Sequence, residues 1–386
     1  MLLYPEFMKL ASYIGKVARR SPGELAAEAA KRLRTASQLE RRLGGRAFRP
    51  YAVSFWLTRR CNLNCGMCWV AASKRLEGDA YVRGGDELSL AELRAVVDNI
   101  ARWRPRIGIT GGEPFLRRDA PDFIAHVKAR RLRCGVNTNG TFLEGDAARL
   151  VALGLDSVMV SIDGPPDVHD RIRRSPGSFA RARASLAALL AERKRRGARA
   201  PYVKVTCTVS GANVDVLAAT PGEFADLPLD EFTFQHLWFT DQRVADAQRA
   251  LFGRLFDQDT TYLQGFVAAD VPPLDAAAVA AQRAEVIARR FPFPVNFYPP
   301  LADADEALFY RDATTVLRRP CFSRWLRLDV LPDGTATPCL GFAAGNVREK
   351  PLTAIWNGSR YRRFRLELAA RRRFPGCERC CGLFSD

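Results

Sequence analysis

Three cysteines lie close together in the segment Cys61-Asn62-Leu63-Asn64-Cys65-Gly66-Met67-Cys68. Thiolates are soft ligands that suit zinc, copper(I) and iron–sulfur clusters. Three of them on one short loop can bind three irons of a 4Fe–4S cluster and leave the fourth iron open to a small molecule. Half of a structural zinc site is the alternative, although zinc loops usually pair C-x-x-C with a second ligand pair. A disulfide knot is disfavoured in a chain of this length, which can bury a large core.

Polar and glycine-rich turns follow three further apolar runs. The first is Gly111-Gly112-Glu113-Pro114, in which the glycines allow close approach to a ligand and the carboxylate can accept hydrogen bonds from an ammonium group. The others are Asn137-Thr138-Asn139-Gly140 and Ser161-Ile162-Asp163-Gly164. Their short polar side chains could bind hydroxyl or carboxylate groups. Ordinary turn chemistry explains each of them equally well.

A second cysteine set lies near the C-terminal end of the sequence. Cys321, Gly334 and Cys339 have the spacing C-x12-G-x4-C, and the segment between the two thiols predicts a hairpin turning at Pro332-Asp333-Gly334. A closing group of thiols follows at Cys377, Cys380 and Cys381. Two separated cysteine pairs could also form a zinc ribbon.

Together these motifs resemble the radical S-adenosylmethionine (SAM) enzymes, whose hallmark is CxxxCxxC after the first strand of a partial barrel. The resemblance implies that Cys61, Cys65 and Cys68 hold a 4Fe–4S cluster whose open iron binds SAM through its amino and carboxylate groups. The cluster is then the catalytic centre, because its reduction cleaves SAM to a 5′-deoxyadenosyl radical that abstracts hydrogen from a substrate. The resemblance also implies other SAM-binding residues, namely Gly111, Gly112, Glu113 and Pro114 at the amino group, Ser161 and Asn139 nearby, Arg171 at the carboxylate, and Met67, Thr208 and Val209 near the adenine.

The second cysteine set resembles the SPASM and shorter Twitch extensions of these enzymes, which carry auxiliary 4Fe–4S clusters. The resemblance implies one auxiliary cluster with a role in electron transfer, held by Cys321, Cys339, Cys377 and Cys380. Cys381 either replaces Cys380 or remains a spare thiol. The expected cofactors are therefore two 4Fe–4S clusters and SAM, with a flavodoxin or ferredoxin as electron donor.

Short apolar runs alternate with amphipathic helical windows between residues 51 and 240, which predicts parallel β/α units. We expect an α/β fold, a partial (β/α)6 TIM-like barrel, whose functional loops meet at the carboxyl ends of the strands. A capping box at Ser89-Leu90-Ala91-Glu92 predicts a helix running to about Trp103. The predicted strands are Ala52–Leu57, Arg106–Thr110, Arg133–Asn137, Ser157–Ile162, Tyr202–Val209 and Glu231–Phe239.

The pattern predicts four regions along the chain. They are N-terminal helices in residues 1–50, the barrel in 51–240, a helical and proline-rich connector in 241–315, and a small SPASM/Twitch-like domain in 316–386. Net charge is +17, which favours acidic partners or a solvated surface. A nucleic-acid-binding zinc protein would leave the GGEP motif without a role, so we expect no nucleic acid.

A basic amphipathic stripe in the first 20 residues predicts a helix that packs on the barrel or, alternatively, contacts a membrane surface. No apolar run is long enough to span a bilayer, and no signal peptide pattern is present. Low-potential clusters need a reducing compartment, so the expected location is cytoplasmic, with peripheral membrane contact as the alternative.

The substrate is the least determined part of this interpretation. The leading hypothesis is oxidative modification of a ribosomal peptide or protein, as in many SPASM-type relatives. The alternative is dehydrogenation, epimerisation or carbon–carbon bond formation on a sugar, aminocyclitol or lipid, which the absence of a recognisable peptide-binding domain favours. Candidate substrate residues are Asp163, Gln235 and His236. Strand alternation predicts that at most one of the last two faces the substrate.

Overall fold

The computed structural model describes residues 44–77, 87–267, 269, 273–315, 321–339, 341–380 and 382. The expected N-terminal helix, its membrane contact and Cys381 lie outside these residues.

A single curved sheet organises the described chain, in the order β10-β9-β8-β1-β2-β3-β4-β5-β6-β7. All neighbouring pairs from β8 through β1 to β7 are parallel. The strands are β1 (Ala52–Trp56), β2 (Arg106–Thr110), β3 (Arg133–Thr138), β4 (Ser157–Ser161), β5 (Tyr202–Val209), β6 (Glu231–His236), β7 (Val295–Tyr298), β8 (Arg327–Val330), β9 (Thr335–Thr337) and β10 (Gly345–Asn346).

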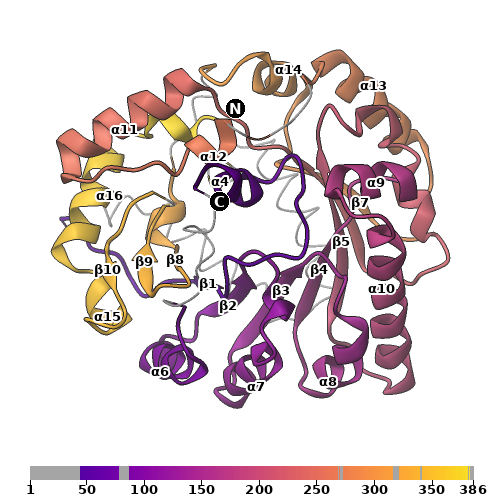
Figure 1. Ribbon diagram of the computed structural model, residues 1–386, viewed down its shortest axis with the longest axis horizontal. Helices are drawn as coiled ribbons and strands as arrows, with labels where there is room; N and C mark the ends of the chain where they lie inside the picture. Colours follow the sequence, from indigo (N-terminus) through magenta and orange to yellow (C-terminus); the bar gives the residue numbers. More distant parts are fainter. Residues whose placement is uncertain are drawn as a thin grey trace, which may run out of the picture.

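Several helices line the outer face of this sheet, whereas helix Trp69–Glu77 lies within its curve (Figure 1). The helices are α4 (Trp69–Glu77), α6 (Leu90–Ile100), α7 (Ala120–Ala129), α8 (Ala147–Ala152), α9 (Pro166–Arg173), α10 (Ser178–Arg195), α11 (Gln242–Phe256), α12 (Gln264–Val267), α13 (Ala276–Ala288), α14 (Asp303–Arg311), α15 (Leu352–Ile355) and α16 (Ser359–Arg371). Short 3-10 turns are Ala101–Trp103, Pro114–Leu116, Glu144–Asp146, Val214–Val216, Thr220–Phe224, Ser323–Trp325 and Pro375–Cys377.

The alternation of side chains explains the two faces. In β1, Val53 and Phe55 are fully buried on the outer face, where the Phe55 ring meets that of Phe123 in α7 at 5.2 Å between centroids. The alternate residue Ser54 lines the interior cavity. The predicted capping box at Ser89 is present and starts α6, whose buried face is Leu93, Val96, Val97 and Ile100.

The predicted partial barrel is confirmed, with one strand end corrected. β2 and β5 have the predicted bounds, and β1, β3 and β4 differ by one residue. β6 ends at His236, three residues before the predicted Phe239. Pairing with β5 stops at Val209↔His236, and beyond it Trp238 packs its ring against Phe266 at 4.2 Å between centroids. The aromatic residues of the segment 237–239 predict a longer strand, but in the structure Trp238 packs against other aromatic rings instead of pairing in the sheet.

The C-terminal hairpin forms as predicted and extends the barrel sheet. β8 and β9 are antiparallel and flank Pro332-Asp333-Gly334, while β8 also pairs in parallel with β1, Ala52 opposite Arg327. β7 adds a further parallel strand from the region expected to be a connector. Within the described residues, none of the helices has both the length and the hydropathy to cross a bilayer.

Candidate active site

The three-cysteine loop joins β1 to α4 at the carboxyl end of the sheet. Cys65 is buried, and Cys61 and Cys68 are half-buried. The Gly66 amide donates to the Ile172 carbonyl at 3.1 Å, which anchors the loop on α9. Burial raises the pKa of Cys61 to about 12. The thiol therefore keeps its proton until a metal displaces it, as thiolate ligation requires.

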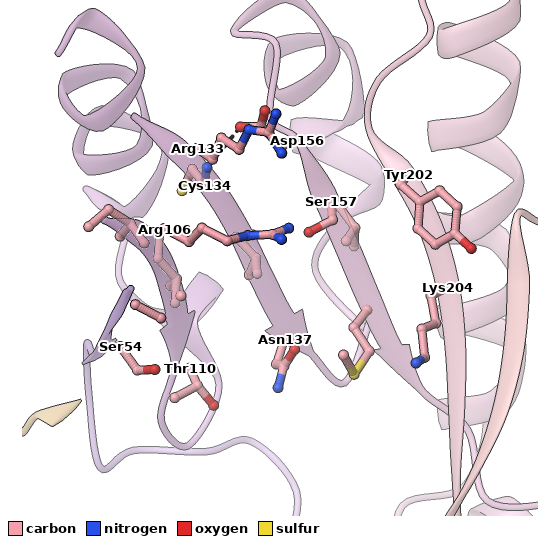
Figure 2. A pocket seen from close by; sticks show the side chains of 18 of the residues that line it. Ser54, Arg106, Thr110, Arg133, Cys134, Asn137, Asp156, Ser157, Tyr202 and Lys204 are labelled. Atoms are coloured by element: carbon pink, nitrogen blue, oxygen red, sulfur yellow. Dashed lines mark hydrogen bonds between the residues drawn. The ribbon is translucent and has the colours of Figure 1, made fainter. Parts of the chain in front are cut away.

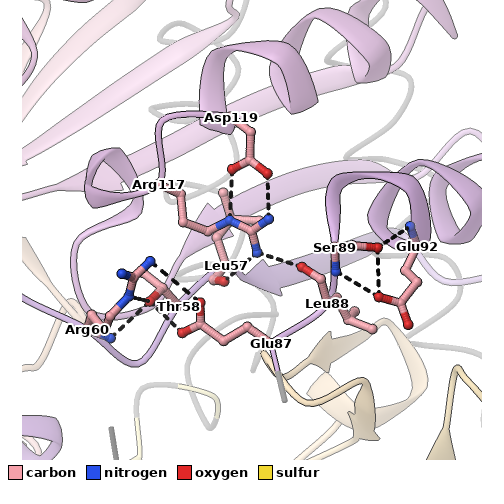
Figure 3. A network of polar contacts seen from close by, with 9 residues as sticks. All are labelled: Leu57, Thr58, Arg60, Glu87, Leu88, Ser89, Glu92, Arg117 and Asp119. Carbon is pink, nitrogen blue, oxygen red and sulfur yellow. Dashed lines mark hydrogen bonds and ion pairs between the residues drawn. The ribbon is translucent and has the colours of Figure 1, made fainter. Parts of the chain in front are cut away.

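The segment that leads into this loop is held by a polar network (Figure 3). Buried Arg117 donates to the Leu57 carbonyl at 3.1 Å and the Leu88 carbonyl at 2.7 Å, and it pairs with Asp119 at 2.7 Å. The Thr58 hydroxyl donates to Glu87 at 2.6 Å. These contacts fix the end of β1 and hence the starting point of the cysteine loop.

The GGEP loop packs directly on the backbone that precedes Cys61. The Gly112 amide donates to the Thr58 carbonyl and the Glu113 amide to the Arg60 carbonyl, each at 2.8 Å. A Cβ on Gly112 would lie 2.1 Å from the Arg60 oxygen, and one on Gly111, which has φ +136°, would lie 2.5 Å from the Thr58 oxygen. The two glycines are therefore required for contact between the loops themselves, in addition to any ligand.

Glu113 is fully buried at the base of this arrangement. Its oxygens accept from the Thr138 hydroxyl and the Asn139 amide, each at 2.8 Å, and from the Phe115 amide at 3.1 Å. Burial raises the pKa of Glu113, while the Asn139 and Phe115 amides act in the opposite direction. A carboxylate has about four acceptor positions, so three donors leave room for a ligand ammonium group.

Asn139 connects the end of β3 with the cysteine loop. Its side-chain amide donates to Asn62 at 2.8 Å and lies 4.0 Å from the Cys61 sulfur, while its oxygen accepts from the Thr141 amide at 2.9 Å. The predicted residues Glu113 and Asn139 thus lie together beside Cys61.

In helix α9, Arg173 reaches the cysteine loop, whereas the predicted Arg171 points to solvent. Arg171 is exposed, whereas Arg173 is buried, pairs with Asp163 at 2.5 Å and places a guanidinium nitrogen 3.7 Å from the Cys65 sulfur. We therefore carry Arg173, in place of Arg171, into the proposal below. Helical spacing held the missing signal, because His169, Ile172 and Arg173 form the buried face of α9.

The remaining predicted residues divide between the two faces of the sheet. Thr208 and Gln235 pair with each other in register. Each lies four residues after a residue that lines the interior cavity, Lys204 in β5 and Glu231 in β6, so both side chains are on the inner face. Ser161 is on the same face, two residues after the cavity residue Met159. Val209 is fully buried and His236 nearly so on the outer face. Asp163 forms an ion pair with Arg173 and accepts a hydrogen bond from the Thr208 amide at 2.9 Å.

His236 packs among helix residues, away from the barrel interior. Its Nδ1 lies 2.5 Å from the Tyr310 hydroxyl, and its ring centroid lies 5.6 Å from that of Phe309 in α14. We therefore leave Val209 and His236 out of the proposed ligand contacts.

An aromatic wall adjoins the cysteine loop and Met67, which is half-buried. The Trp69 ring lies 5.5 Å from that of Trp56 at the end of β1 and 4.6 Å from that of Tyr262. Of the residues near this wall, the sequence motifs point only to Met67, because the contacts between the rings depend on the fold.

Four cysteines of the C-terminal region line one small cavity. They are Cys321, Cys339, Cys377 and Cys380, together with the apolar side chains Phe364, Leu368 and Phe374 and the buried Arg324. Four thiols around one cavity are a ligand set that a 4Fe–4S cluster takes, as the resemblance implies.

Comparison with known proteins agrees with this geometry. Residues 57–219 match the sequence profile of the radical SAM superfamily, and residues 321–381 match that of the SPASM iron–sulfur cluster-binding domain. Fe-coproporphyrin III synthase of Methanosarcina barkeri is 37% identical over 125 residues, which are 32% of this chain and 30% of that protein. Pre-heme d1 synthase of Dinoroseobacter shibae is 31% identical over 215 residues, 54% of this chain and 50% of that protein.

Among solved structures, Streptococcus suis SuiB bound to S-adenosylmethionine has a similar fold. The TM-score is 0.56 at 12% identity, and the match covers 92% of this chain and 77% of SuiB. SuiB bound to its precursor peptide SuiA matches with a TM-score of 0.55.

These matches and the two cysteine sites define the class: the chain belongs to the radical SAM superfamily. More particularly, it combines a radical SAM domain with a C-terminal SPASM domain, and the cofactors of these domains are SAM and iron–sulfur clusters, as predicted. The chain spans half or less of the length of the two curated relatives.

Proposed function

We propose that this chain cleaves SAM reductively and removes a hydrogen atom from an organic substrate. The observation that carries the proposal is the junction of three loops around Cys61. The GGEP loop hydrogen-bonds to residues 58–60, and Asn139 reaches the same loop from β3. When bound, the cluster and SAM supply a 5′-deoxyadenosyl radical, which is chemistry that belongs to the cofactor.

In this proposal the protein binds and orients SAM and the substrate. Cys61, Cys65 and Cys68 hold the cluster, and buried Glu113 accepts from the SAM amino group beside Gly111, Gly112 and Pro114. Arg173, which replaces Arg171 in this role, and Ser161 serve the carboxylate. Asn139 positions the cysteine loop, Thr208 and Met67 border the adenine, and Gln235 faces the substrate.

The second cysteine cavity supports a further role for the SPASM domain. We propose that Cys321, Cys339, Cys377 and Cys380 hold one auxiliary 4Fe–4S cluster that transfers electrons between the barrel and a flavodoxin or ferredoxin. Cys380 lines the cavity with the other three thiols, which favours it as the fourth ligand.

Two substrate classes follow from the relatives, and a small molecule is the better supported. The proteins with 31% and 37% identity are named for tetrapyrrole products. The peptide-bound relative shares the fold at 12% identity. Modification of a peptide, the leading hypothesis from the sequence, becomes the second candidate.

The test uses anaerobically reconstituted protein and its Cys61→Ala/Cys65→Ala/Cys68→Ala variant. We expect about eight irons per chain in the wild type and about four in the variant. Dithionite and SAM should yield 5′-deoxyadenosine only with the wild type. Zinc in place of iron, or equal SAM cleavage by both proteins, would contradict the proposal.

A further inference from the structure

A polar cavity occupies the barrel interior on the amino-terminal side of the proposed SAM site. Its volume is about 470 Å³. The residues that line it belong mostly to the first and middle parts of strands β1 to β6 and to β8, and the lining reaches Thr110 at the end of β2. Figure 2 shows Ser54, Arg106, Asn137 and Lys204 around this space, with the Arg106 side chain extended across it toward Ser157. None of these residues has a role in the proposed SAM chemistry.

The amino-terminal end of the cavity carries a row of arginines. Arg327 is opposite Ala52, Ala52 is opposite Arg106, and Arg106 is opposite Arg133, so three arginines lie at one level of four adjacent strands. All three line the cavity. We call Arg106, Arg133 and Arg327 the arginine row.

The carboxylates at the cavity have their own close partners. Glu231 lies 3.1 Å from the Lys204 ammonium group and accepts from the Tyr202 hydroxyl at 2.7 Å. Although burial alone would raise it, these partners lower the pKa of Glu231 to about 2. Asp156 binds the Lys128 ammonium group at 2.5 Å and the Cys134 amide at 2.8 Å.

Asp329 is the remaining acid near the row. It is 6% exposed and lies 3.5 Å from Arg327. The lining therefore includes four cations, namely the arginine row and Lys204, against two carboxylates, with Asp329 behind them. The field in the cavity is positive.

Two glycines make room in front of the arginine row. Gly108 and Gly135 lie on the inner face two residues after Arg106 and Arg133, and both line the cavity. A Cβ on Gly135 would lie 2.5 Å from the Ser157 hydroxyl oxygen, and one on Gly108 would lie 3.2 Å from the Ser54 hydroxyl oxygen. A larger residue at either position would displace these serines, so the two glycines keep this level of the cavity free of any further side chain.

We infer that this cavity binds a carboxylate or phosphate group of the substrate on the arginine row. Guanidinium groups recognise both anions through paired hydrogen bonds. The arginine row lies four residues, roughly 13 Å, below the strand ends where SAM chemistry is proposed. The substrate is accordingly an elongated anion, with its reactive carbon at the carboxyl ends of the strands and its charged group at the amino-terminal ends. This inference rests on the proposed function and specifies its substrate.

The test measures anion binding by isothermal titration calorimetry on the reconstituted holoenzyme at low ionic strength. The probes are inorganic pyrophosphate and succinate, which represent the two anion chemistries. The variants are Arg106→Gln/Arg133→Gln and Arg106→Lys. The matched control is Arg195→Gln, on α10, whose side chain is 65% exposed. Iron content and circular dichroism verify that each variant is folded.

We expect the double glutamine variant to weaken binding of at least one probe tenfold or more. Arg106→Lys should retain part of the affinity, and Arg195→Gln should bind within twofold of the wild type. The probe that loses more affinity identifies the anion chemistry. Equal binding by the folded double variant and the wild type, or binding of neither probe by the wild type, would overturn the inference.

SAM cleavage on the same preparations keeps the two proposals apart. Protein that forms 5′-deoxyadenosine but binds neither anion refutes only the arginine row. Protein that binds anions through the row but never cleaves SAM refutes the proposed function, and with it the assignment of the anion as a substrate group.

Discussion

One buried ion pair connects the cysteine loop with the rest of the barrel at the scale of single residues. Arg173 lies between Asp163, which is fully buried, and the Cys65 sulfur. Burial raises the pKa of Asp163, and the positive charge of Arg173 acts in the opposite direction. A neutral residue at position 173 would leave that carboxylate without its counter-charge next to the cluster loop.

We therefore expect Arg173→Gln to lower the free energy of unfolding by about 3 to 5 kcal/mol, the usual cost of breaking a buried pair. SAM affinity should fall with it. The matched control is Arg171→Gln on the same helix, which should change stability by less than about 0.5 kcal/mol because Arg171 is exposed. Anaerobic urea denaturation and equilibrium dialysis with SAM measure both quantities. Equal effects of the two variants would contradict the assignment of Arg173.

Sequence patterns located some site residues well and others poorly. Cys61 and Glu113 belong to compact motifs, and the structure brings the two loops together. The motif Asp170-Arg171-Ile172-Arg173 alone does not show which of its two arginines faces the site. Only the burial of the neighbouring His169 and Ile172 does so. Isolated polar residues such as His236 carry no signal of which face they occupy until the strand register is known.

At the scale of elements, β6 is attached to α13 and α14 by a buried polar cluster. The His236 Nε2 atom lies 3.6 Å from Glu306, and the Arg283 Nε atom lies 3.3 Å from the same carboxylate. Burial and, to a lesser extent, Arg283 lower the pKa of His236 to about 4. Burial also raises the pKa of Glu306. The imidazole is thus neutral in the folded protein at neutral pH.

This cluster predicts a pH dependence of stability. The unfolded imidazole takes up a proton near pH 6.5 and the folded one only near pH 4, so acidification between these values favours unfolding. The free energy of unfolding should fall by at most about 1.4 kcal/mol per pH unit through His236. Glu306 acts with the opposite sign, because its pKa is raised by folding. The difference between His236→Gln and the wild type isolates the histidine.

Anaerobic urea denaturation of both proteins from pH 8 to pH 4 measures this difference. The variant should show a flatter decline than the wild type between pH 6.5 and pH 4. Parallel curves for the two proteins would refute the role of His236.

Elements were predicted more completely than side-chain positions. Strands buried on one face alternate apolar residues with polar or small ones between turn residues, and the predicted bounds of β2 and β5 match the structure to the residue. The sequence patterns do not predict the short strand β7, and the predicted hairpin of β8 and β9 does not reveal that β8 also joins the barrel, because the partners in these pairings are distant in sequence. Arg327 in β8 pairs opposite Ala52 in β1, a contact that no local pattern encodes.

At the scale of the whole molecule, the two cysteine sites belong to separate parts of one sheet. The loop with Cys61 lies at the carboxyl end of β1, whereas Cys321 lies before β8, whose first residue pairs with Ala52 at the opposite end of β1. Each site has its own ligands and its own buried arginine. The clusters should therefore load independently.

We expect Cys377→Ser/Cys380→Ser to reduce iron from about eight to about four per chain and to leave reductive SAM cleavage measurable. Turnover of the substrate should be lost if the auxiliary cluster carries its electron. Iron analysis, electron paramagnetic resonance of the reduced protein and 5′-deoxyadenosine assays measure these effects. Full iron content in the double variant would remove Cys377 and Cys380 as ligands.

The pairing of β1 with β8 has a consequence for how the protein is made. Ribosomes add about 5 to 20 residues per second. Residue 327 follows residue 52 by 275 positions, so the nascent β1 waits roughly 15 to 55 s for its second neighbour. During that time an apolar strand, AVSFW, presents an unpaired edge. Translation that stalls before residue 327 leaves this edge open to other chains, and chaperone supply at that stage should limit the soluble yield.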